Sequence, residues 1–300
     1  NTMFYTTGNL VIALDGVTGK DIWKVDLNRL VVDSGDFHNA ARLPSPPKAA
    51  GSETGVKYLD IGGSTKYGVA YWPGAGKTPA RIVMATRSGY MLQFDAKTGA
   101  LITSVGKAGL IDLRIGLMEK FAGAEMSPGM VPTIYKNLAI VMAKSGEQGR
   151  YGAAGDPRAY DLLTGKEVWR FHTVPQPGEE NFGTWGLDGW QDRRGPGGWV
   201  AMSIDPANNL VVIGTTNTND QNYGGMRPGS NLYAASTLAL DGDTGKLKWW
   251  FQHTHHDIYD WATSSNPVLA DIKDKDGKTV PAVLQPTKSG FMFVLNRLTG

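Results

Sequence analysis

The chain has 300 residues, of which 30 are basic and 28 acidic, so its net charge is +2. The basic residues form no cluster along the sequence, which argues against a nucleic-acid partner, because phosphate contacts need clustered Lys and Arg. It has no cysteine, which excludes disulfides, Cys-ligated zinc and iron–sulfur clusters. No apolar run reaches the about 18 residues of a transmembrane helix, so we expect no membrane span in this chain.

Five segments repeat one pattern along the chain: an apolar strand, Asp or Asn, two or three residues, Thr-Gly, and usually a second strand with Trp. The apolar alternation fits a strand, and Asp and Gly at fixed positions predict a tight turn, since Gly accepts the φ > 0 that other residues resist. Such repeats, with 39 Gly and 16 Pro between short strands, predict an all-β protein of the β-propeller type. The copies are ALDGVTGKDIW (13–23), QFDAKTGALI (93–102), AYDLLTGKEVW (159–169), ALDGDTGKLKW (239–249) and VLNRLTG (294–300).

A radial array of repeats is one cooperative body, so we expect residues 1–300 to form a single β-propeller domain. The chain opens inside a strand-like segment and stops at the Thr-Gly of a repeat, which predicts a propeller incomplete at one or both ends. Polar stretches rich in Gly or Pro predict long loops at 33–58, 173–198 and 218–232, the second of them packed by Trp185 and Trp190.

Four residues that could carry chemistry stand at the edges of predicted strands. Glu147 and Asn217 offer oxygen ligands suited to Ca²⁺, Trp199 offers a flat face for stacking a planar ligand, and Asp260 could act as a general base. Each also has a plainer interpretation. Glu147 could be a solvated turn residue, Asn217 a turn former, Trp199 a core residue and Asp260 a loop carboxylate.

Longer stretches resemble one known family over nearly the whole chain and in the right order. The segments are GVAYWPG, RIVMATRSGYMLQFDAKTG, GDPRAYDLLTGKEVWRFHTVP, GPGGWVAMSID, VVIGTTN, LALDGDTGKLKWWFQHTHHDIYDWATSSNPVLADI and LQPTKSGFMFVLNRLTG. They look like the quinoprotein dehydrogenases that bind pyrroloquinoline quinone (PQQ). The resemblance implies an eight-bladed propeller of which this chain covers a part.

The resemblance also implies roles for particular residues. Glu147, Asn217 and Asp260 fall on positions around the Ca²⁺ ion, and Asp260 on the catalytic base. Trp199 falls on the residue that stacks under the quinone, and Lys288 on a basic residue that hydrogen-bonds the quinone carbonyls. The implied activity is oxidation of an alcohol, polyol or sugar hydroxyl by hydride transfer to Ca²⁺-bound PQQ, in the periplasm, with a cytochrome c or ubiquinone as electron acceptor.

The chain departs from the family pattern at several positions. Ile61-Gly62-Gly63 stands where the alcohol dehydrogenases carry adjacent half-cystines, and Tyr67 stands where an Arg often contacts a quinone carboxylate. Ala262 lacks the extra Asp of lanthanide-using relatives, which favours Ca²⁺. The run 255–257 is similar to the membrane-bound aldose and polyol branch, whereas Asn217 is similar to the alcohol branch, so the subfamily stays open.

A second function belongs to a different class: a non-catalytic propeller scaffold of the outer-membrane assembly type, which shares the Asp-x-x-Thr-Gly-x-x-x-Trp repeat without a cofactor. The presence together of Glu147, Asn217, Asp260 and Lys288 favours the enzyme, because a scaffold has no reason to keep them. The three histidines 253, 255 and 256 lack a fourth ligand nearby and predict structural or rim roles.

Overall fold

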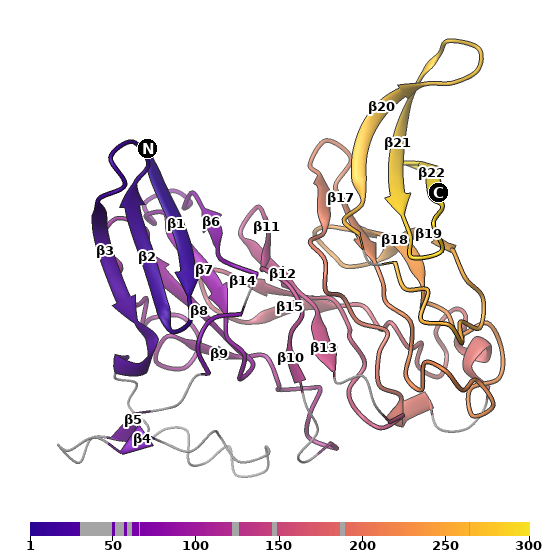
Figure 1. The fold of residues 1–300 in the computed structure, drawn as a ribbon, viewed down its shortest axis with the longest axis horizontal. Helices are drawn as coiled ribbons and strands as arrows, with labels where there is room; N and C mark the ends of the chain where they lie inside the picture. The colour runs from indigo at the N-terminus through magenta and orange to yellow at the C-terminus, as the bar shows by residue number, and fades with distance from the viewer. Residues whose placement is uncertain are drawn as a thin grey trace. The chain divides into compact units, whose positions relative to one another are not determined.

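A computed structural model describes residues 1–30, 50–51, 57–58, 62–65, 67–121, 126–145, 149–186, 190–263 and 265–300 (Figure 1). The described chain consists of short strands and a few 3₁₀ turns, which confirms the all-β prediction. It forms two compact units, each described by itself. The first contains Asn1–Val141 and Tyr160–Glu167, and the second contains Met142–Ala159 and Val168–Gly300.

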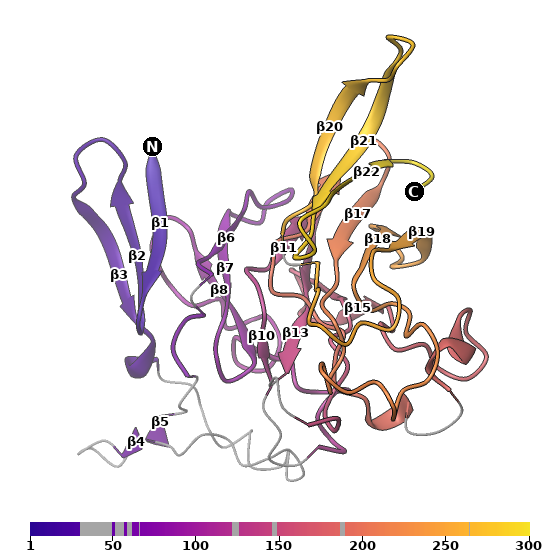
Figure 2. The same ribbon diagram turned by 45° about the vertical axis from the view of Figure 1, so that its right-hand side comes forward.

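The first unit is built from antiparallel sheets whose strands follow one another in sequence (Figure 2). The sheet orders are β1-β2-β3, β4-β5 and β6-β7-β8-β9, and β11 pairs with β12. The bounds are β1 (Thr2–Thr7), β2 (Leu10–Asp15), β3 (Asp21–Asp26), η1 (Leu27–Arg29), β4 (Ala50–Gly51), β5 (Lys57–Tyr58), β6 (Ala70–Trp72), β7 (Arg81–Ala85), β8 (Tyr90–Asp95), β9 (Leu110–Asp112), β10 (Met126–Pro128), β11 (Thr133–Tyr135) and β12 (Leu138–Val141). Short strands β4 and β5 lie within 33–58, where the sequence predicted a loop throughout.

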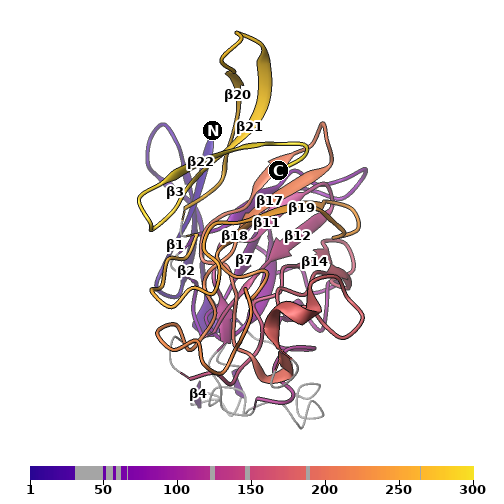
Figure 3. The same cartoon turned by 90° about the vertical axis from the view of Figure 1, so that its right-hand side faces the viewer.

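The second unit has the same construction, with sheet orders β16-β17-β18-β19 and β20-β21-β22 (Figure 3). Its strands and turns are β13 (Ala143–Ser145), η3 (Phe182–Trp185), η4 (Trp190–Asp192), β16 (Ser203–Asp205), β17 (Leu210–Gly214), β18 (Ser236–Asp241), β19 (Leu247–Gln252), β20 (Val268–Lys273), β21 (Thr279–Pro286) and β22 (Met292–Asn296). The remaining strands are β14 (Arg158–Asp161) and β15 (Glu167–Arg170). Four strands in sequence order, each antiparallel to the next, are the construction of a propeller blade.

The middle strands of the four-stranded sheets are buried on both faces. Every residue of β7 and β17 is buried, and β8 and β18 are buried up to their final Asp. Continuous burial explains why these strands read as unbroken apolar runs with few polar residues, since each sheet is covered on both sides. Where the sequence predicted a packed loop at 173–198, Trp185 is fully buried and Trp190 packs edge-on against Phe182 at 5.5 Å.

The predicted turn forms in all five repeats. At Asp95, one carboxylate oxygen accepts the backbone N–H of Lys97 and of Thr98 and the Thr98 hydroxyl, at 3.0, 2.8 and 2.9 Å. Gly99 then donates its N–H to the Asp95 carbonyl at 2.9 Å with φ of +76°. The same bonds recur at Asp15, Asp161 and Asp241. At Asn296 the amide oxygen accepts the two backbone N–H groups, those of Leu298 and Thr299, at 2.9 and 3.2 Å.

The repeated Trp connects each copy to the turn of a later copy. Its indole N–H donates to the carbonyl directly after the Asp or Asn of that turn, and its ring lies against the turn glycine. The three contacts are Trp23 to Ala96 at 3.1 Å, Trp169 to Gly242 at 3.0 Å and Trp249 to Arg297 at 2.9 Å, over Gly99, Gly245 and Gly300.

The second repeat has no Trp, and Arg81 takes over its hydrogen bond. The buried Arg81 guanidinium donates to the carbonyl of Leu162, which follows the turn Asp161, at 2.7 Å, and to Gln93 Oε1 at 2.8 Å. The same kind of carbonyl is therefore satisfied by a guanidinium in place of an indole. Burial lowers the pKa of Arg81, but an arginine stays charged at neutral pH.

Gly245→Ala is expected to destabilise the protein more than Gly19→Ala. Both glycines have φ of +69°, so both substitutions carry a similar backbone strain of about 1–2 kcal/mol. A Cβ at Gly245 would lie 2.6 Å from Trp169 Cε3, whereas nothing lies within 4 Å of one at Gly19. The extra loss should be roughly 1–3 kcal/mol, measured by denaturant unfolding. Equal losses in the two variants would show that the ring contact contributes nothing.

His253 predicts a pH-dependent stability. Its ring packs between Phe251 and Phe293, with centroid distances of 5.3 and 4.3 Å, and Nε2 lies 2.8 Å from Thr237 Oγ1. Burial lowers the pKa of His253 from 6.5 to about 4. The unfolded chain therefore binds a proton that the folded protein does not, and this contribution to stability is complete above pH 6.5 and is lost as the pH falls toward 4.

His253→Phe should remove that dependence. The difference in unfolding free energy between wild type and variant should fall by on the order of 2–3 kcal/mol as the pH drops from about 7 to about 4. Denaturant unfolding at several pH values measures it. Parallel stability curves for the two proteins would show that His253 is not held neutral by the fold.

Candidate functional site

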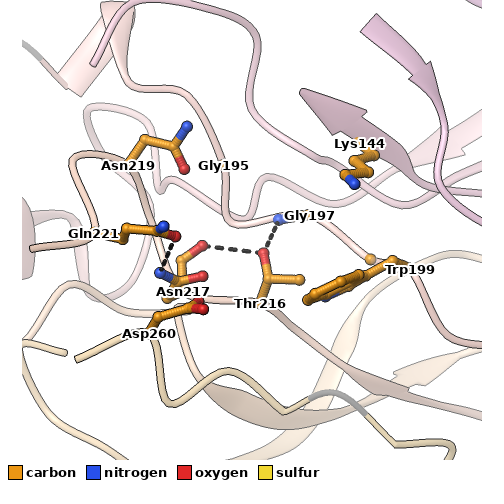
Figure 4. A pocket seen from close by; sticks show the side chains of 10 residues that line it. Lys144, Gly195, Gly197, Trp199, Thr216, Asn217, Asn219, Gln221 and Asp260 are labelled. Carbon is orange, nitrogen blue, oxygen red and sulfur yellow. Dashed lines mark hydrogen bonds between the residues drawn. The ribbon is translucent and has the colours of Figure 1, made fainter. Parts of the chain in front are cut away.

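A pocket opens in the second unit (Figure 4). Its walls come from β13, from the Gly-rich segment before β16, from the segment after β17 and from the loop after β19. The pocket brings together Trp199, Asn217 and Asp260, three residues that the sequence singled out. The residues that line it are Lys144, Gly195, Gly197, Gly198, Trp199, Thr216, Asn217, Asn219, Gln221 and Asp260.

Trp199 presents its ring to this pocket and is only partly buried. Two ammonium groups lie over the ring, Lys288 Nζ at 5.1 Å and Lys144 Nζ at 5.3 Å from its centroid. Such distances are within the range of cation–π attraction. The Trp199 Nε1 atom is buried without a hydrogen-bond partner in the described part of the chain. A flat, electron-rich ring with two cations beside it suits a planar, electron-poor and acidic ligand.

Glycines hold the segment that carries Trp199 close against its neighbours. Gly197 N–H donates to Thr216 Oγ1 at 3.0 Å, and Thr216 N–H donates to the Gly197 carbonyl at 2.9 Å. A Cβ on Gly197 would lie 2.4 Å from the carbonyl oxygen of Ala143, and one on Gly155 would lie 2.0 Å from the Gly197 Cα. No side chain fits there. The Gly-Pro-Gly-Gly run is therefore needed to bring Trp199 to the end of β17.

Asn217 lies just beyond β17 and is 6% exposed. Its Nδ2 donates to Gln221 Oε1 at 3.2 Å. With the amide nitrogen engaged as a donor, the amide oxygen is the atom that could accept a cation or a ligand hydrogen. Amide and carboxylate oxygens are ligands that Ca²⁺ takes, so the side chains of Asn217 and Asp260 suit such an ion chemically.

Asp260 and Lys288 form an ion pair beside Trp199. Lys288 Nζ lies 2.8 Å from Asp260 Oδ2, and the two side chains are 29% and 37% exposed. An ion pair of this exposure contributes little to stability, about 0–1 kcal/mol. The ion pair matters for position: it joins the lysine that follows β21, which lies over the Trp199 ring, to the carboxylate that follows β19 and lines the same pocket.

The loop that carries Asp260 is held in an uncommon conformation by Asp257. Asp260 has φ of +59°, which non-glycine residues seldom adopt. The buried Asp257 carboxylate accepts the backbone N–H of Tyr259 at 2.9 Å and of Trp261 at 2.7 Å, one on each side of Asp260. Burial raises the pKa of Asp257, while these two backbone bonds lower it. The buried Arg227 side chain donates to the backbone carbonyl of Asp257 at 2.5 Å, which adds a third hydrogen bond that holds this loop.

Two of the predictions lie outside the described residues. Glu147, the remaining metal ligand suggested by the sequence, is one of them, and so is Ile61 of the segment that replaces the half-cystines. Within the described ranges, no group of three or more His, Asp or Glu side chains is placed to hold a metal ion. Gly62, Gly63 and Tyr67 are described and belong to the first unit.

Sequence reasoning missed Lys144, Gln221 and Asp257. Lys144 is an isolated lysine in a strand, and Asp257 looks like an ordinary member of a His-Asp run. Nothing in the sequence singled out Asp257, because its partners are the backbone amides of Tyr259 and Trp261, and any residue except proline has such an amide. Nothing in the spacing of Lys144 pointed to Trp199. In the described part of the chain, no helix has the length and apolar character needed to cross a bilayer.

Comparison with known proteins gives one consistent family. The family model described as "PQQ: Glucose/ethanol/alcohol dehydrogenase, beta-propeller domain" matches residues 1–300. The quinoprotein glucose dehydrogenase of Gluconobacter oxydans is 32% identical over 97% of this chain and 34% of its own length. Methanol dehydrogenase [cytochrome c] subunit 1 of Methylorubrum extorquens is 32% identical over 78% of this chain and 37% of its own length.

Among solved structures, the quinohemoprotein alcohol dehydrogenase from Comamonas testosteroni has a TM-score of 0.74 at 28% identity, and the match covers all of this chain and 40% of that one. The chain thus spans about a third of the length of the curated relatives that it matches. The comparisons bear out the β-propeller prediction and agree that a chain of this length covers only part of such a propeller.

Asp257→Asn is expected to lower thermal stability by an amount equivalent to about 1–3 kcal/mol, because an amide oxygen replaces one acceptor while the amide NH₂ meets a backbone donor. Asp276→Asn, in the exposed turn between β20 and β21, is the control and should change stability by less than about 0.5 kcal/mol. Thermal unfolding measures both. An Asp257→Asn protein as stable as the control would mean that the loop does not depend on the two bonds.

Proposed function

The chain belongs to the PQQ-dependent glucose, ethanol and alcohol dehydrogenase family, and we propose that the pocket at Trp199 is where its protein binds PQQ and oxidises a hydroxyl group. The observation that carries the proposal is the assembly of Trp199, Asn217, Asp260 and Lys288 around one pocket. They come from separate segments of the second unit, and each has the chemistry that the sequence assigned to it.

Trp199 would hold the cofactor by stacking, and Lys288 would donate to its carbonyl oxygens. The partly buried ring supports this role, as does the unpartnered Nε1 at its edge. When bound, PQQ supplies the redox chemistry by accepting the electrons and hydrogen that leave the substrate carbon. Asn217, Asp260 and Glu147 would hold a Ca²⁺ ion, whose preference for oxygen ligands suits these side chains.

Asp260 would accept the proton of the substrate hydroxyl. Lys288 Nζ donates to the Asp260 carboxylate at 2.8 Å and so holds it at the pocket beside Trp199. The side chain is 37% exposed at the pocket, so a hydroxyl can reach it. Loss of the hydroxyl proton to Asp260, together with loss of a hydride from the same carbon to the bound cofactor, would turn the carbon–oxygen bond of the substrate into a carbonyl. The product of a primary alcohol is thus an aldehyde, and that of a secondary alcohol or sugar carbon a ketone or lactone.

Substrate and electron acceptor are proposed by class. Relatives are named for glucose, methanol, glycerol and quinate or shikimate, all of which carry hydroxyl groups. We propose an alcohol, polyol or sugar as substrate, a cytochrome c or ubiquinone as acceptor and the periplasm as location. We also propose that residues 1–300 belong to one β-propeller domain. A non-catalytic scaffold is the alternative, and it predicts no affinity for the cofactor.

The test is reconstitution. Purified protein given PQQ and Ca²⁺ should oxidise members of a panel of alcohols, polyols and sugars with an artificial electron acceptor, and a chelator should abolish the activity. Asp260→Asn should retain PQQ binding while turnover falls by roughly 10² to 10⁴, the usual contribution of a general base. Asp276→Asn, which removes a carboxylate from an exposed turn, serves as the control.

Two results would contradict the proposal. Failure of the wild type to bind PQQ in the presence of Ca²⁺ would favour the scaffold. Near-normal turnover of Asp260→Asn would place the base on another residue while leaving cofactor binding in place.

A further inference from the structure

Another pocket lies in the second unit, and it shares no lining residue with the pocket at Trp199. It is lined by the segment that follows β15 and by the turn that joins β18 to β19. The proposed chemistry does not use it. Its apolar wall includes Phe171, Pro175 and Leu247, and its polar lining includes Tyr233, Glu180 and Lys246.

Tyr233 brings a hydrogen-bond donor to this pocket. The residue is 3% exposed, and its ring packs against Phe171 with the centroids 5.0 Å apart. Asn181 Nδ2 donates to the Tyr233 hydroxyl at 3.0 Å, and in the described part of the chain the hydroxyl hydrogen itself has no acceptor. Burial raises the pKa of Tyr233, and the charges of Glu180 and Glu179 at the same pocket raise it further, so the hydroxyl keeps its proton. A buried donor without an acceptor is unfavourable, and a ligand oxygen would satisfy it.

The two adjacent glutamates at this pocket differ in the bonds that they already make. Glu179 Oε1 lies 2.8 Å from His172 Nδ1, and Glu179 Oε2 accepts the backbone N–H of Gln176 at 2.7 Å. Among the residues that the structure describes, the Glu180 carboxylate has no hydrogen bond or ion pair, and neither has the Lys246 ammonium. The pocket therefore offers a carboxylate acceptor and an ammonium donor in addition to the phenolic donor.

Backbone hydrogen bonds hold the two aromatic residues in place. Tyr233 N–H donates to the Thr173 carbonyl at 2.9 Å, and the Tyr233 carbonyl accepts the Thr215 hydroxyl at 2.6 Å. Phe171 N–H donates to the Pro157 carbonyl at 3.1 Å. A ligand would thus meet an aromatic wall that is already positioned, which lowers the entropy that binding must overcome.

We propose that this pocket binds a neutral monosaccharide, independently of the proposed function. A sugar hydroxyl can accept a hydrogen bond from Tyr233 or Lys246 and donate one to Glu180, because a hydroxyl is both donor and acceptor. The C–H face of the sugar ring can pack on the Phe171 side chain. Besides His172, the charged side chains that line the pocket are two acids and two bases, which favours a ligand without net charge.

Saturation-transfer NMR of the purified protein without PQQ tests this assignment, so that no sugar is consumed. D-glucose is titrated, and cyclohexanol, which keeps a six-membered ring but has a single hydroxyl, is the comparison ligand. Tyr233→Phe removes only the hydroxyl, and Glu180→Gln keeps the shape of the side chain and removes its charge. Asp276→Asn, in the exposed turn between β20 and β21, is the control variant. The glucose titration is repeated with PQQ and Ca²⁺ present, because the two pockets share no lining residue.

Glucose should bind the wild type more tightly than cyclohexanol does, with or without PQQ. Tyr233→Phe should weaken glucose binding about fivefold and Glu180→Gln about tenfold, since each loses a hydrogen bond and the second bond has a charged acceptor. Asp276→Asn should match the wild type. A wild type that does not bind glucose, unchanged glucose affinity in either pocket variant, equal affinity for cyclohexanol, or displacement of glucose by PQQ would overturn the proposal. Glucose binding in a protein that does not bind PQQ would overturn the proposed function and support this site.

Discussion

The contact between an indole and the turn of a later repeat is the interaction on which the sheets depend. The contact has three parts. The residue after the turn Asp offers its backbone carbonyl, the turn glycine leaves room because it has no side chain, and a tryptophan from the last strand of a preceding repeat donates its indole N–H to that carbonyl. The Asp carboxylate supplies the first of these by tying the turn through two backbone bonds and one hydroxyl bond. At the third turn Arg81 donates to the Leu162 carbonyl, the same kind of acceptor that an indole serves at the turns of Asp95, Asp241 and Asn296.

The proposed site residues lie in loops that begin at strand ends, and the packing of the sheets holds these strand ends in place. Asn217 follows β17, Asp260 follows β19 and Lys288 follows β21, so each of these proposed site residues lies just after a strand that its sheet holds in place. The glycines before Trp199 extend the same principle, because they let backbone approach backbone where a side chain would keep the indole away from the pocket. Because the strand ends are held in place, the Asp260–Lys288 ion pair can position both side chains although it contributes little to the free energy of unfolding.

Much of the fold and part of the site could be predicted from the sequence. Asp95, Gly99 and their counterparts are local signals, since the bonds that they make lie within four residues. Trp199, Asn217, Asp260 and Lys288 were assigned through family resemblance, because separation in sequence says nothing about convergence in space. Lys144 and Asp257 were missed for the same physical reason. Lys144 approaches Trp199 because β13 packs against the glycines at 197 and 198. Asp257 binds backbone amides, which are the same for every residue except proline.

Asp260, the proposed base, has the least ordinary backbone conformation among the proposed site residues. A φ of +59° costs an aspartate about 1–2 kcal/mol relative to an ordinary conformation, and its carboxylate also pairs with Lys288. The loop around it is tied by Asp257 on both sides and by the buried Arg227 at the Asp257 carbonyl. Burying Arg227 and Asp257 has its own cost, which their hydrogen bonds offset. The hydrogen bonds of Asp257 and Arg227 therefore stabilise the positive φ of Asp260. Without them we expect the loop to relax to an ordinary conformation, which would move the Asp260 carboxylate away from Lys288 and Trp199.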